Sequence, residues 1–180
     1  MLGITQNLLA YYPVLSIKVI QEFAKAYFPL VELTCQQFQI NLHDTGINGD
    51  HFGLQVLSDI EFDQCHKILL QYTKLVHDHV IHQRRNRVYH YHLPVQVNGI
   101  TIPKIEIFEP KPDADISKLR PGIEHIAFVV DDYDQFLTEY KSKRIPIDKE
   151  INLQGSKFFK TKFINIIEIE FRNDELGGKD

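Results

Sequence analysis

The order of apolar and polar positions divides the chain near Leu42. Before Leu42, apolar residues recur at three- and four-residue intervals, a spacing that places one side of a helix against a core. The stripe includes Val19, Phe23, Ala26, Tyr27 and Leu30. Because proline kinks or ends a helix, Pro13 and Pro29 predict two or three helices rather than one. We interpret residues 1–44 as an N-terminal helical extension.

After the Gly- and Asn-rich loop HDTGINGD, the pattern changes to strands and repeats itself. Asp50–Phe62 reads DHFGLQVLSDIEF, and Glu124–Phe136 reads EHIAFVVDDYDQF. Both copies run acid, His, apolar, small, apolar, any residue, Val, and then enter a helix with matching capping residues. The offset is constant, since 125 − 51, 132 − 58 and 135 − 61 all equal 74. The chain therefore contains an internal duplication of a strand followed by a helix.

Each copy continues with three further strand candidates, of which the first copy includes a turn at Asn98-Gly99. The unit is therefore β-α-β-β-β, in modules at about 45–110 and 122–173, joined by the Pro-rich link EPKPDADISKLRPG. We expect an α+β fold in which residues 45–180 form one domain. Its two βαβββ modules should build one curved mixed sheet, with helices on the outer side and the N-terminal extension at its flank.

Alternate side chains of a strand point to opposite faces, so the faces can be compared. Four strands each have one apolar face and one face with polar side chains. The polar faces carry His51 and Gln55, Glu106, His125, and the pair Glu168/Glu170. If the helices cover the apolar faces, two histidines and two or three carboxylates project into the hollow of the sheet. Imidazole nitrogens and carboxylate oxygens suit Zn²⁺, Ni²⁺, Mn²⁺ or Fe²⁺. Alternatively, the glutamates are ordinary solvent-facing acids and His51 pairs with Asp50.

The duplicated βαβββ unit, with His on each first strand and Glu on each last strand, resembles the vicinal oxygen chelate superfamily, which includes glyoxalase I, extradiol dioxygenases and bleomycin-resistance proteins. The fragments GIEHIAFVV, KIEIFEP and IIEIEF are similar to its ligand strands. The helical extension, DHFGLQV and the glutamate strand that leads through a Pro-rich link into EHI look more narrowly like the YecM-like family. The resemblance covers about residues 45–173.

This resemblance implies one divalent metal ion held by His51, Glu106, His125 and Glu168. The superfamily's common Asp-Pro-Asp-Gly turn is absent before the last glutamate strand, so Glu170 could replace Glu168 as ligand. Glu109 is an alternative to Glu106, although it would need a β-bulge to face inward.

His90 and His92 share one strand face, and we interpret them, with Gln55, as lining of a substrate pocket, against surface histidines as the alternative. The function expected is metal-assisted isomerase, lyase or dioxygenase chemistry on a small oxygenated molecule chelated through two oxygens. Glu168, as a displaced ligand, or a pocket histidine would move the proton. The competing interpretation is a non-catalytic small-molecule binding protein of the same fold.

Composition and charge narrow the classes of protein to which the chain can belong. A 43% hydrophobic fraction over 180 residues supports a core without disulfides, and Cys35 and Cys65 are expected to be reduced. The net charge of −4 is spread along the chain and gives no long basic surface for nucleic acid. Apolar runs are too short to span a bilayer, and the N-terminus lacks secretory features. We therefore expect no nucleic-acid or membrane partner and a cytoplasmic location; the sequence leaves the oligomeric state open.

Overall fold

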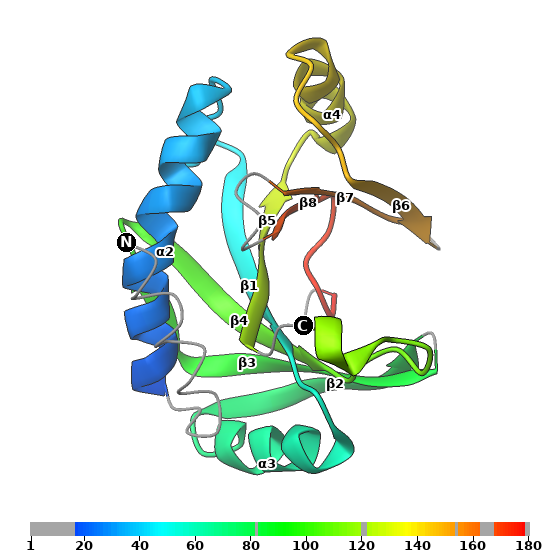
Figure 1. Ribbon diagram of the computed structural model, residues 1–180. Coiled ribbons are helices and arrows are strands. Elements are labelled where there is room, and N and C mark those ends of the chain that lie inside the picture. Colours follow the sequence, from blue (N-terminus) through cyan, green and yellow to red (C-terminus); the bar gives the residue numbers. More distant parts are fainter. Residues whose placement is uncertain (1–16, 82, 120–121, 154, 163–167, 179–180) are drawn as a thin grey trace.

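The computed structural model describes residues 17–178 apart from 82, 120–121, 154 and 163–167. Eight strands form one curved mixed sheet in the order β2-β3-β4-β1-β5-β8-β7-β6 (Figure 1). The strands are β1 (Ile47–Gln55), β2 (Thr73–Ile81), β3 (Arg84–Val97), β4 (Ile100–Phe108), β5 (Gly122–Val130), β6 (Lys149–Leu153), β7 (Ser156–Lys162) and β8 (Glu168–Arg172). The helices are α2 (Ile17–Gln37), α3 (Asp59–Leu69), α4 (Tyr133–Ser142) and the short 3-10 helix η2 (Ile116–Lys118).

The two halves of this sheet have the same topology, which confirms the two βαβββ modules. In the first, β4 pairs parallel with β1, and in the second β8 pairs parallel with β5. The modules join where β1 and β5 run antiparallel at the centre of the sheet. The duplication found in the sequence is therefore an approximate two-fold relation between two halves of one sheet.

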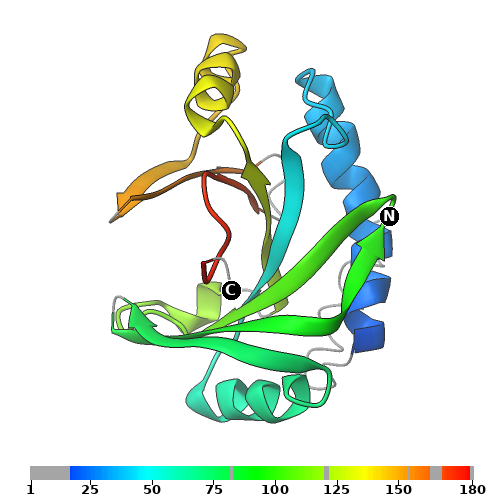
Figure 2. The ribbon, with the colours of Figure 1, turned by 180° about the vertical axis from the view of Figure 1, so that it is seen from behind.

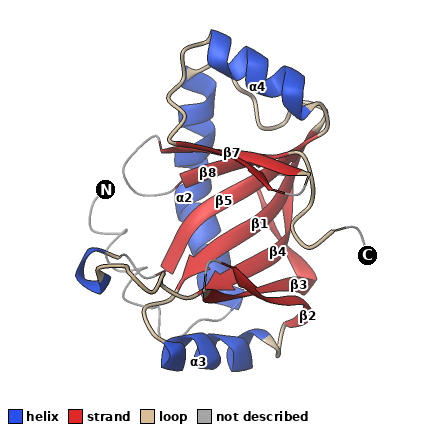
Figure 3. Ribbon diagram, turned by 90° about the vertical axis from the view of Figure 1, so that its right-hand side faces the viewer, coloured by secondary structure: helices blue, strands red, loops and turns tan. Residues whose placement is uncertain are grey.

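Helices cover the convex side of the sheet and leave the concave side to polar groups. Helix α3 lies beneath the first module and α4 above the second, while α2 crosses behind the central strands β1 and β5 rather than at the flank that the sequence predicted (Figures 1 and 3). The apolar face predicted for β1 is buried, with Phe52 and Leu54 each 1% exposed. The ring of Phe23 on α2 meets that of Phe52 edge-on at 6.3 Å. Burial of one face of the sheet thus fixes which side chains turn inward on the other.

Pro29 does not end a helix, so the predicted division of the extension at Pro29 is wrong, while Pro13 lies outside the described residues. Residues 17–37 form the single helix α2, and Pro29 lies inside it on the exposed side. A proline removes one backbone hydrogen bond, but the opposite side of this helix buries a long apolar stripe that holds it in place. That stripe comprises Ile20, Phe23, Ala24, Tyr27, Phe28, Val31 and Cys35. Across the described residues, no helix is both long and apolar enough to cross a bilayer.

The predicted N-capping residues of both copies of the repeat are confirmed. The side chain of Ser58 accepts a hydrogen bond from the backbone N–H of Glu61 at 3.2 Å, and Asp132 accepts one from Gln135 at the same distance. These bonds start α3 and α4 at matching places after β1 and β5. Asn98 and Gly99 both have positive φ angles, 48° and 82°, as a tight two-residue hairpin between β3 and β4 requires.

The segment after β8 turns back against the concave side of the sheet. Figures 1 and 2 show the chain running from β8 back toward the first module. The backbone N–H of Leu176 donates to Asp50 Oδ2 at 3.0 Å, and Glu175 lies 3.0 Å from Lys104 Nζ. These contacts attach Glu175 and Leu176 to β4 and to β1, the strand that carries His51.

Candidate metal centre

Two β-bulges on the central strand pair define the site. In β1, Gly49 pairs with Phe128 and His51 with Ala127, so Asp50 is an extra residue. In β5, His125 pairs with Gly53 and Ile123 with Leu54, so Glu124 is extra. The extra residue of a bulge is re-aimed relative to the regular alternation. Each bulge therefore lets an acid reach the histidine that follows it.

The two histidines meet over the centre of the sheet. His51 Nε2 lies 3.0 Å from His125 Nε2, and Glu106 Oε2 lies 3.8 Å from the first and 3.5 Å from the second. His51 and His125 are buried, at 0% and 2% exposure, while Glu106 is partly buried. Among the residues that the structure describes, this trio is the one group of three or more His, Cys, Asp or Glu whose ligand atoms all lie within 4.8 Å of one another.

The groups in contact with the ring nitrogens of the two histidines fit a bound cation. His51 Nδ1 lies 2.7 Å from Asp50 Oδ2, and His125 Nδ1 lies 3.2 Å from Glu124 Oε2. An imidazole that donates its Nδ1 proton to a carboxylate presents a lone pair at Nε2. Two such lone pairs 3.0 Å apart repel each other unless a proton or a metal ion lies between them. Ligand atoms about 2.1 Å from one ion at angles of roughly 90–110° are about 3.0–3.4 Å apart, close to the spacing observed.

Neighbouring groups orient these side chains. Asn86 Nδ2 donates to Glu106 Oε1 at 2.5 Å, which leaves Glu106 Oε2 toward the histidines. Burial would raise the pKa of Asp50, but the hydrogen bond from His51 and the nearby cations outweigh it, so that this pKa lies below its usual value. Asp50 is therefore an anion, and the proton between Asp50 and His51 belongs to the imidazole.

The ring of His125 rests directly on Gly53. A Cβ added at Gly53 would lie 2.0 Å from Cε1 of His125 and 2.3 Å from its Nδ1, far inside any normal contact. The ring of Phe108 also stacks on that of His125, with centroids 5.9 Å apart and planes inclined by 14°. The small residue of the first repeat thus makes room for the histidine of the second.

The structure does not bring Glu168 into the His51–Glu106–His125 group. Glu168 lies opposite His125 in the sheet, and Glu170 lies opposite Ala127. Since Glu106 lies opposite Gly53, and 127 − 53 is again 74, Glu170 is the repeat equivalent of Glu106. The fourth predicted position thus has two glutamates on one strand face, as the alternation indicated.

Lys160 separates those glutamates from the histidines. Its Nζ lies 3.2 Å from Glu170, 3.8 Å from Glu168 and 3.4 Å from His125 Nδ1. Burial would lower the pKa of Lys160, but the surrounding carboxylates outweigh it and hold this pKa above its usual value. Glu170 is buried and also bound by Arg172 at 2.8 Å. Although burial would raise the pKa of Glu170, Lys160 and the other nearby cations lower it to about 2.

The predicted pocket residues lie at different distances from the trio. His90 is opposite Lys104, which is opposite His51, so His90 lies on the same face two strands away, at roughly 10 Å. His92 is exposed beyond a register shift in β3. The amide of Gln55 is buried and donates to the carbonyl oxygens of Val56 and Phe108 at 2.6 and 3.3 Å, so it fastens the strand ends.

Glu109, the alternative to Glu106, lies elsewhere. Arg85 binds both of its carboxylate oxygens, through Nε at 2.5 Å and through the backbone N–H at 2.8 Å. Glu109 does not belong to the histidine group.

Four residues of the site were not predicted from the sequence: Asp50, Glu124, Asn86 and Lys160. A signal for two of them was present, because an acid precedes the histidine in both copies of the repeat. Asn86 and Lys160 lie on strands β3 and β7, where nothing in the spacing marks a polar residue as a neighbour of the site.

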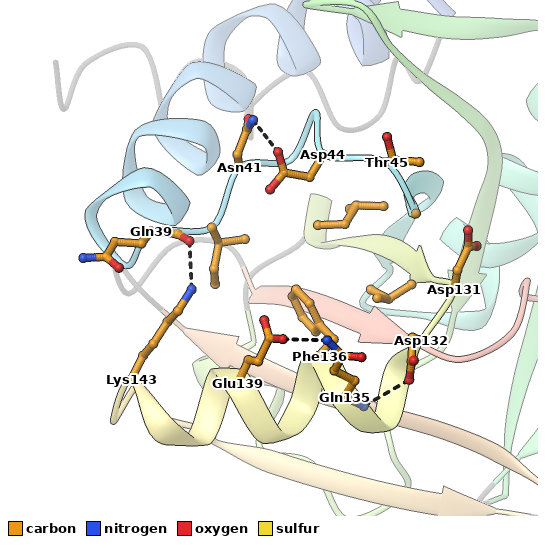
Figure 4. A pocket seen from close by; sticks show the side chains of 14 residues that line it. Gln39, Asn41, Asp44, Thr45, Asp131, Asp132, Gln135, Phe136, Glu139 and Lys143 are labelled. Atoms are coloured by element: carbon orange, nitrogen blue, oxygen red, sulfur yellow. Dashed lines mark hydrogen bonds between the residues drawn. The ribbon is translucent and has the colours of Figure 1, made fainter.

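A cavity of about 330 Å³ lies apart from this centre, between α4 and the loop that follows α2 (Figure 4). Its polar side chains largely bond to one another or to backbone, as Lys143 does with Gln39 O at 2.8 Å and Gln135 with Glu139 at 2.9 Å. Neither the trio nor its partners line this cavity. The His51–Glu106–His125 group and this cavity are therefore separate features of the molecule.

Comparisons with solved structures support the fold. A structural-genomics target named Protein EC4020 is 16% identical, with a TM-score of 0.71, and the match covers 89% of this chain and 88% of that one. Methylmalonyl-CoA epimerase from Streptomyces coelicolor, in a complex with 2-nitronate-propionyl-CoA, is 17% identical over 69% of this chain and 95% of its own, with a TM-score of 0.52. The epimerase from Mycobacterium tuberculosis is 20% identical over 69% and 86%, with a TM-score of 0.50.

These likenesses place the chain in the vicinal oxygen chelate fold. A search of curated proteins found no match. The YecM protein family matches residues 18–174, which include α2 and both modules. The chain therefore belongs to the YecM family.

Proposed function

We propose that this protein is a metal-dependent enzyme that acts on a small oxygenated substrate bound through two oxygens. His51, Glu106 and His125 would hold one divalent ion, of Zn, Ni, Mn or Fe, with Glu168 as the fourth ligand. The observation that carries the proposal is the pair of Nε2 atoms at 3.0 Å, each backed by a carboxylate at Nδ1 and faced by Glu106. Imidazole and carboxylate groups in this number suit such ions and leave coordination positions for a substrate.

When bound, a divalent ion supplies a Lewis acid that stabilises negative charge on a substrate oxygen. Proton transfer to and from the substrate would then fall to the residues of the chain. Glu170 is held by Lys160 and Arg172 as an anion with a pKa of about 2, which makes it a poor proton acceptor near neutral pH. Glu168 is more exposed, at 21% of its side chain, and lies on the same face. We assign proton transfer to Glu168, with His90 as a more distant pocket group.

One cation near the trio, Arg84, favours a substrate that carries an anionic group. The guanidinium of Arg84 lies 4.7 Å from the ring centroid of Phe108, which stacks on His125. Its Nε is buried and has no hydrogen-bond partner among the described residues. A buried donor of this kind is costly unless something accepts from it, and an anionic substrate group would do so.

The reaction class follows from this chemistry together with the fold. Methylmalonyl-CoA epimerases share the fold, and a complex with 2-nitronate-propionyl-CoA is known for one of them. Proton abstraction beside a carbonyl therefore heads the reactions to test, ahead of lyase and dioxygenase chemistry. Any CoA ester, hydroxy-ketone, thiol adduct or catechol that turns over would define the substrate class.

The test begins with elemental analysis of the purified protein beside His125→Ala. We expect about one equivalent of a divalent metal in the wild type and a large loss in the variant. A substrate screen then uses protein loaded with Zn²⁺, Ni²⁺, Mn²⁺ or Fe²⁺. No turnover with any metal, together with ligand binding that survives chelation, would replace the enzyme by a non-catalytic binding protein of the same fold.

A further inference from the structure

We propose that Asp50 and Glu124 are positioning residues, which hold His51 and His125 with a proton on Nδ1 and with Nε2 turned to the ion. This inference rests on the proposed metal site. Neither acid is a metal ligand, but each determines which ring nitrogen of its histidine binds the metal ion.

A β-bulge in the backbone makes each of these two contacts possible. In a regular strand, neighbouring side chains point to opposite faces, so an acid next to a histidine in the chain cannot reach its ring. The bulge at Asp50 and the bulge at Glu124 remove that obstacle on both strands of one pair. They lie 74 residues apart, which is the offset of the repeat, and the same acid–Nδ1 contact follows from each. A fortuitous pairing would not be expected to recur at equivalent positions and on the same ring nitrogen.

Asp50 is fixed in place by three donors. His51 Nδ1 and the backbone N–H of Leu176 both donate to its Oδ2, at 2.7 and 3.0 Å, and Lys104 Nζ lies 3.4 Å from its Oδ1. Its exposure is 1%. A buried carboxylate with both oxygens engaged cannot rotate away, so it holds the imidazole in one orientation.

At the second histidine, two groups approach the same nitrogen. Glu124 Oε2 lies 3.2 Å from His125 Nδ1, and Lys160 Nζ lies 3.4 Å from it. An ammonium group has no acceptor, so only Glu124 can accept a proton from Nδ1. When Nε2 carries the ion, Nδ1 must carry the proton, and Lys160 is then directed to Glu170 at 3.2 Å. Metal binding through Nε2 thus selects Glu124 as the partner.

The substitutions that test this leave the ligand atoms in place. Glu124→Ala removes the acceptor, Glu124→Gln restores an uncharged acceptor of the same length, and Asp50→Asn does the same at the first histidine. Glu150→Gln is the matched control, because it removes a carboxylate that is 48% exposed and pairs with Lys141. Each protein is titrated with Zn²⁺ against a chromophoric chelator. The Zn²⁺-loaded proteins are then examined by ¹⁵N NMR of the imidazole rings, which distinguishes protonated from ligating nitrogens.

We expect the Zn²⁺ dissociation constant to rise about 10–100-fold for Glu124→Ala, as is usual when the partner of a ligating histidine is lost. Glu124→Gln and Asp50→Asn should lie between that variant and the wild type, and Glu150→Gln should match the wild type. Spectra of the wild type should show a proton on Nδ1 of both histidines. In Glu124→Ala, the Nδ1 proton of His125 should exchange faster or the ligating nitrogen should change.

The outcomes separate this inference from the function on which it rests. If the wild type binds Zn²⁺ through both histidines, and Glu124→Ala keeps both its affinity and its Nδ1 proton, the positioning role is overturned while the metal site stands. If the wild type binds none of the four metals, the proposed function is overturned and this inference with it. If Asp50→Asn does not fold, the Glu124 series decides alone, since Glu124 is only partly buried.

Discussion

Gly53→Ala tests the metal centre with a single methyl group. The added Cβ would lie 2.0 Å from His125 Cε1, whereas ordinary contacts begin at 3.4 Å, so the ring must move by about 1.4 Å (3.4 − 2.0). Metal–ligand distances tolerate only about 0.2 Å. We therefore expect a larger effect than the loss of an outer partner, namely Zn²⁺ binding weakened by more than about 100-fold, or about 2.8 kcal/mol.

The same substitution should affect stability less. His125 rests on Gly53, stacks with Phe108 and is 2% exposed, so overpacking should lower the free energy of unfolding by about 1–3 kcal/mol. Gly99→Ala is the control: no atom lies within 4 Å of its added Cβ, but its φ of +82° strains any side chain. That variant should lose about 1–2 kcal/mol of stability and keep its Zn²⁺ affinity.

Chelator competition gives the affinities, and urea denaturation of metal-free protein gives the stabilities. The substitution is then repeated in a His125→Ala background, where Gly53→Ala should have little further effect on Zn²⁺ because the ring that it displaces is gone. Wild-type affinity in Gly53→Ala would refute the idea that His125 binds the ion from its observed position. An equal loss in both backgrounds would show that Gly53 acts by another route.

Three further predictions concern other parts of the chain. His90→Ala should leave Zn²⁺ affinity within about twofold of the wild type, since His90 lies two strands from His51, and should reduce only a substrate step; a large loss of metal in calorimetric titration would contradict this. Burial, with a smaller contribution from Glu32, raises the pKa of the Cys35 thiol to about 12 from an unfolded value of 9.0. Cys35 should therefore resist thiol reagents in the native state at pH 8, and the free energy of unfolding should fall as pH rises from 9 toward 12; rapid native-state labelling would disprove it. Deleting residues 176–180 removes the hydrogen bond from Leu176 N–H to Asp50 and should lower the free energy of unfolding by about 1.5–3 kcal/mol, to be checked in urea. An unchanged midpoint would mean that water replaces this donor at no cost.

Most of the fold could be predicted from the internal repeat and from the alternation of side chains along the strands. A shift by one residue would turn a strand's whole apolar set to the other face, so the buried positions of β1 and β5 fix the inward direction of His51 and His125. Helix α2 is where the local rule failed. Pro29 is a helix breaker by propensity, yet tertiary burial of one side of α2 outweighs the one lost hydrogen bond.

The finer structure of the site could not be read from alternation. A β-bulge adds one residue to a strand, and the neighbouring sequence does not show it. The contacts of Asp50 and Glu124 with their histidines therefore follow only from the strand pairing. The choice between Glu168 and Glu170 has the same origin. Both share a face, and only the strand pairing shows that Glu168 lies opposite His125 and Glu170 opposite Ala127.

One residue breaks the two-fold relation between the halves. Glu106 and Glu170 are equivalent by register, but β3 places Val88 opposite Glu106, whereas β7 places Lys160 opposite Glu170. An apolar neighbour leaves Glu106 Oε2 to face the histidines. A lysine neighbour, helped by Arg172, neutralises Glu170 and holds it in an ion pair. In the proposed site the ion would therefore take one glutamate firmly, from the first module. The ligand position on the second module would be filled weakly by Glu168 or left to the substrate, and a substrate that chelates through two oxygens needs such an open position.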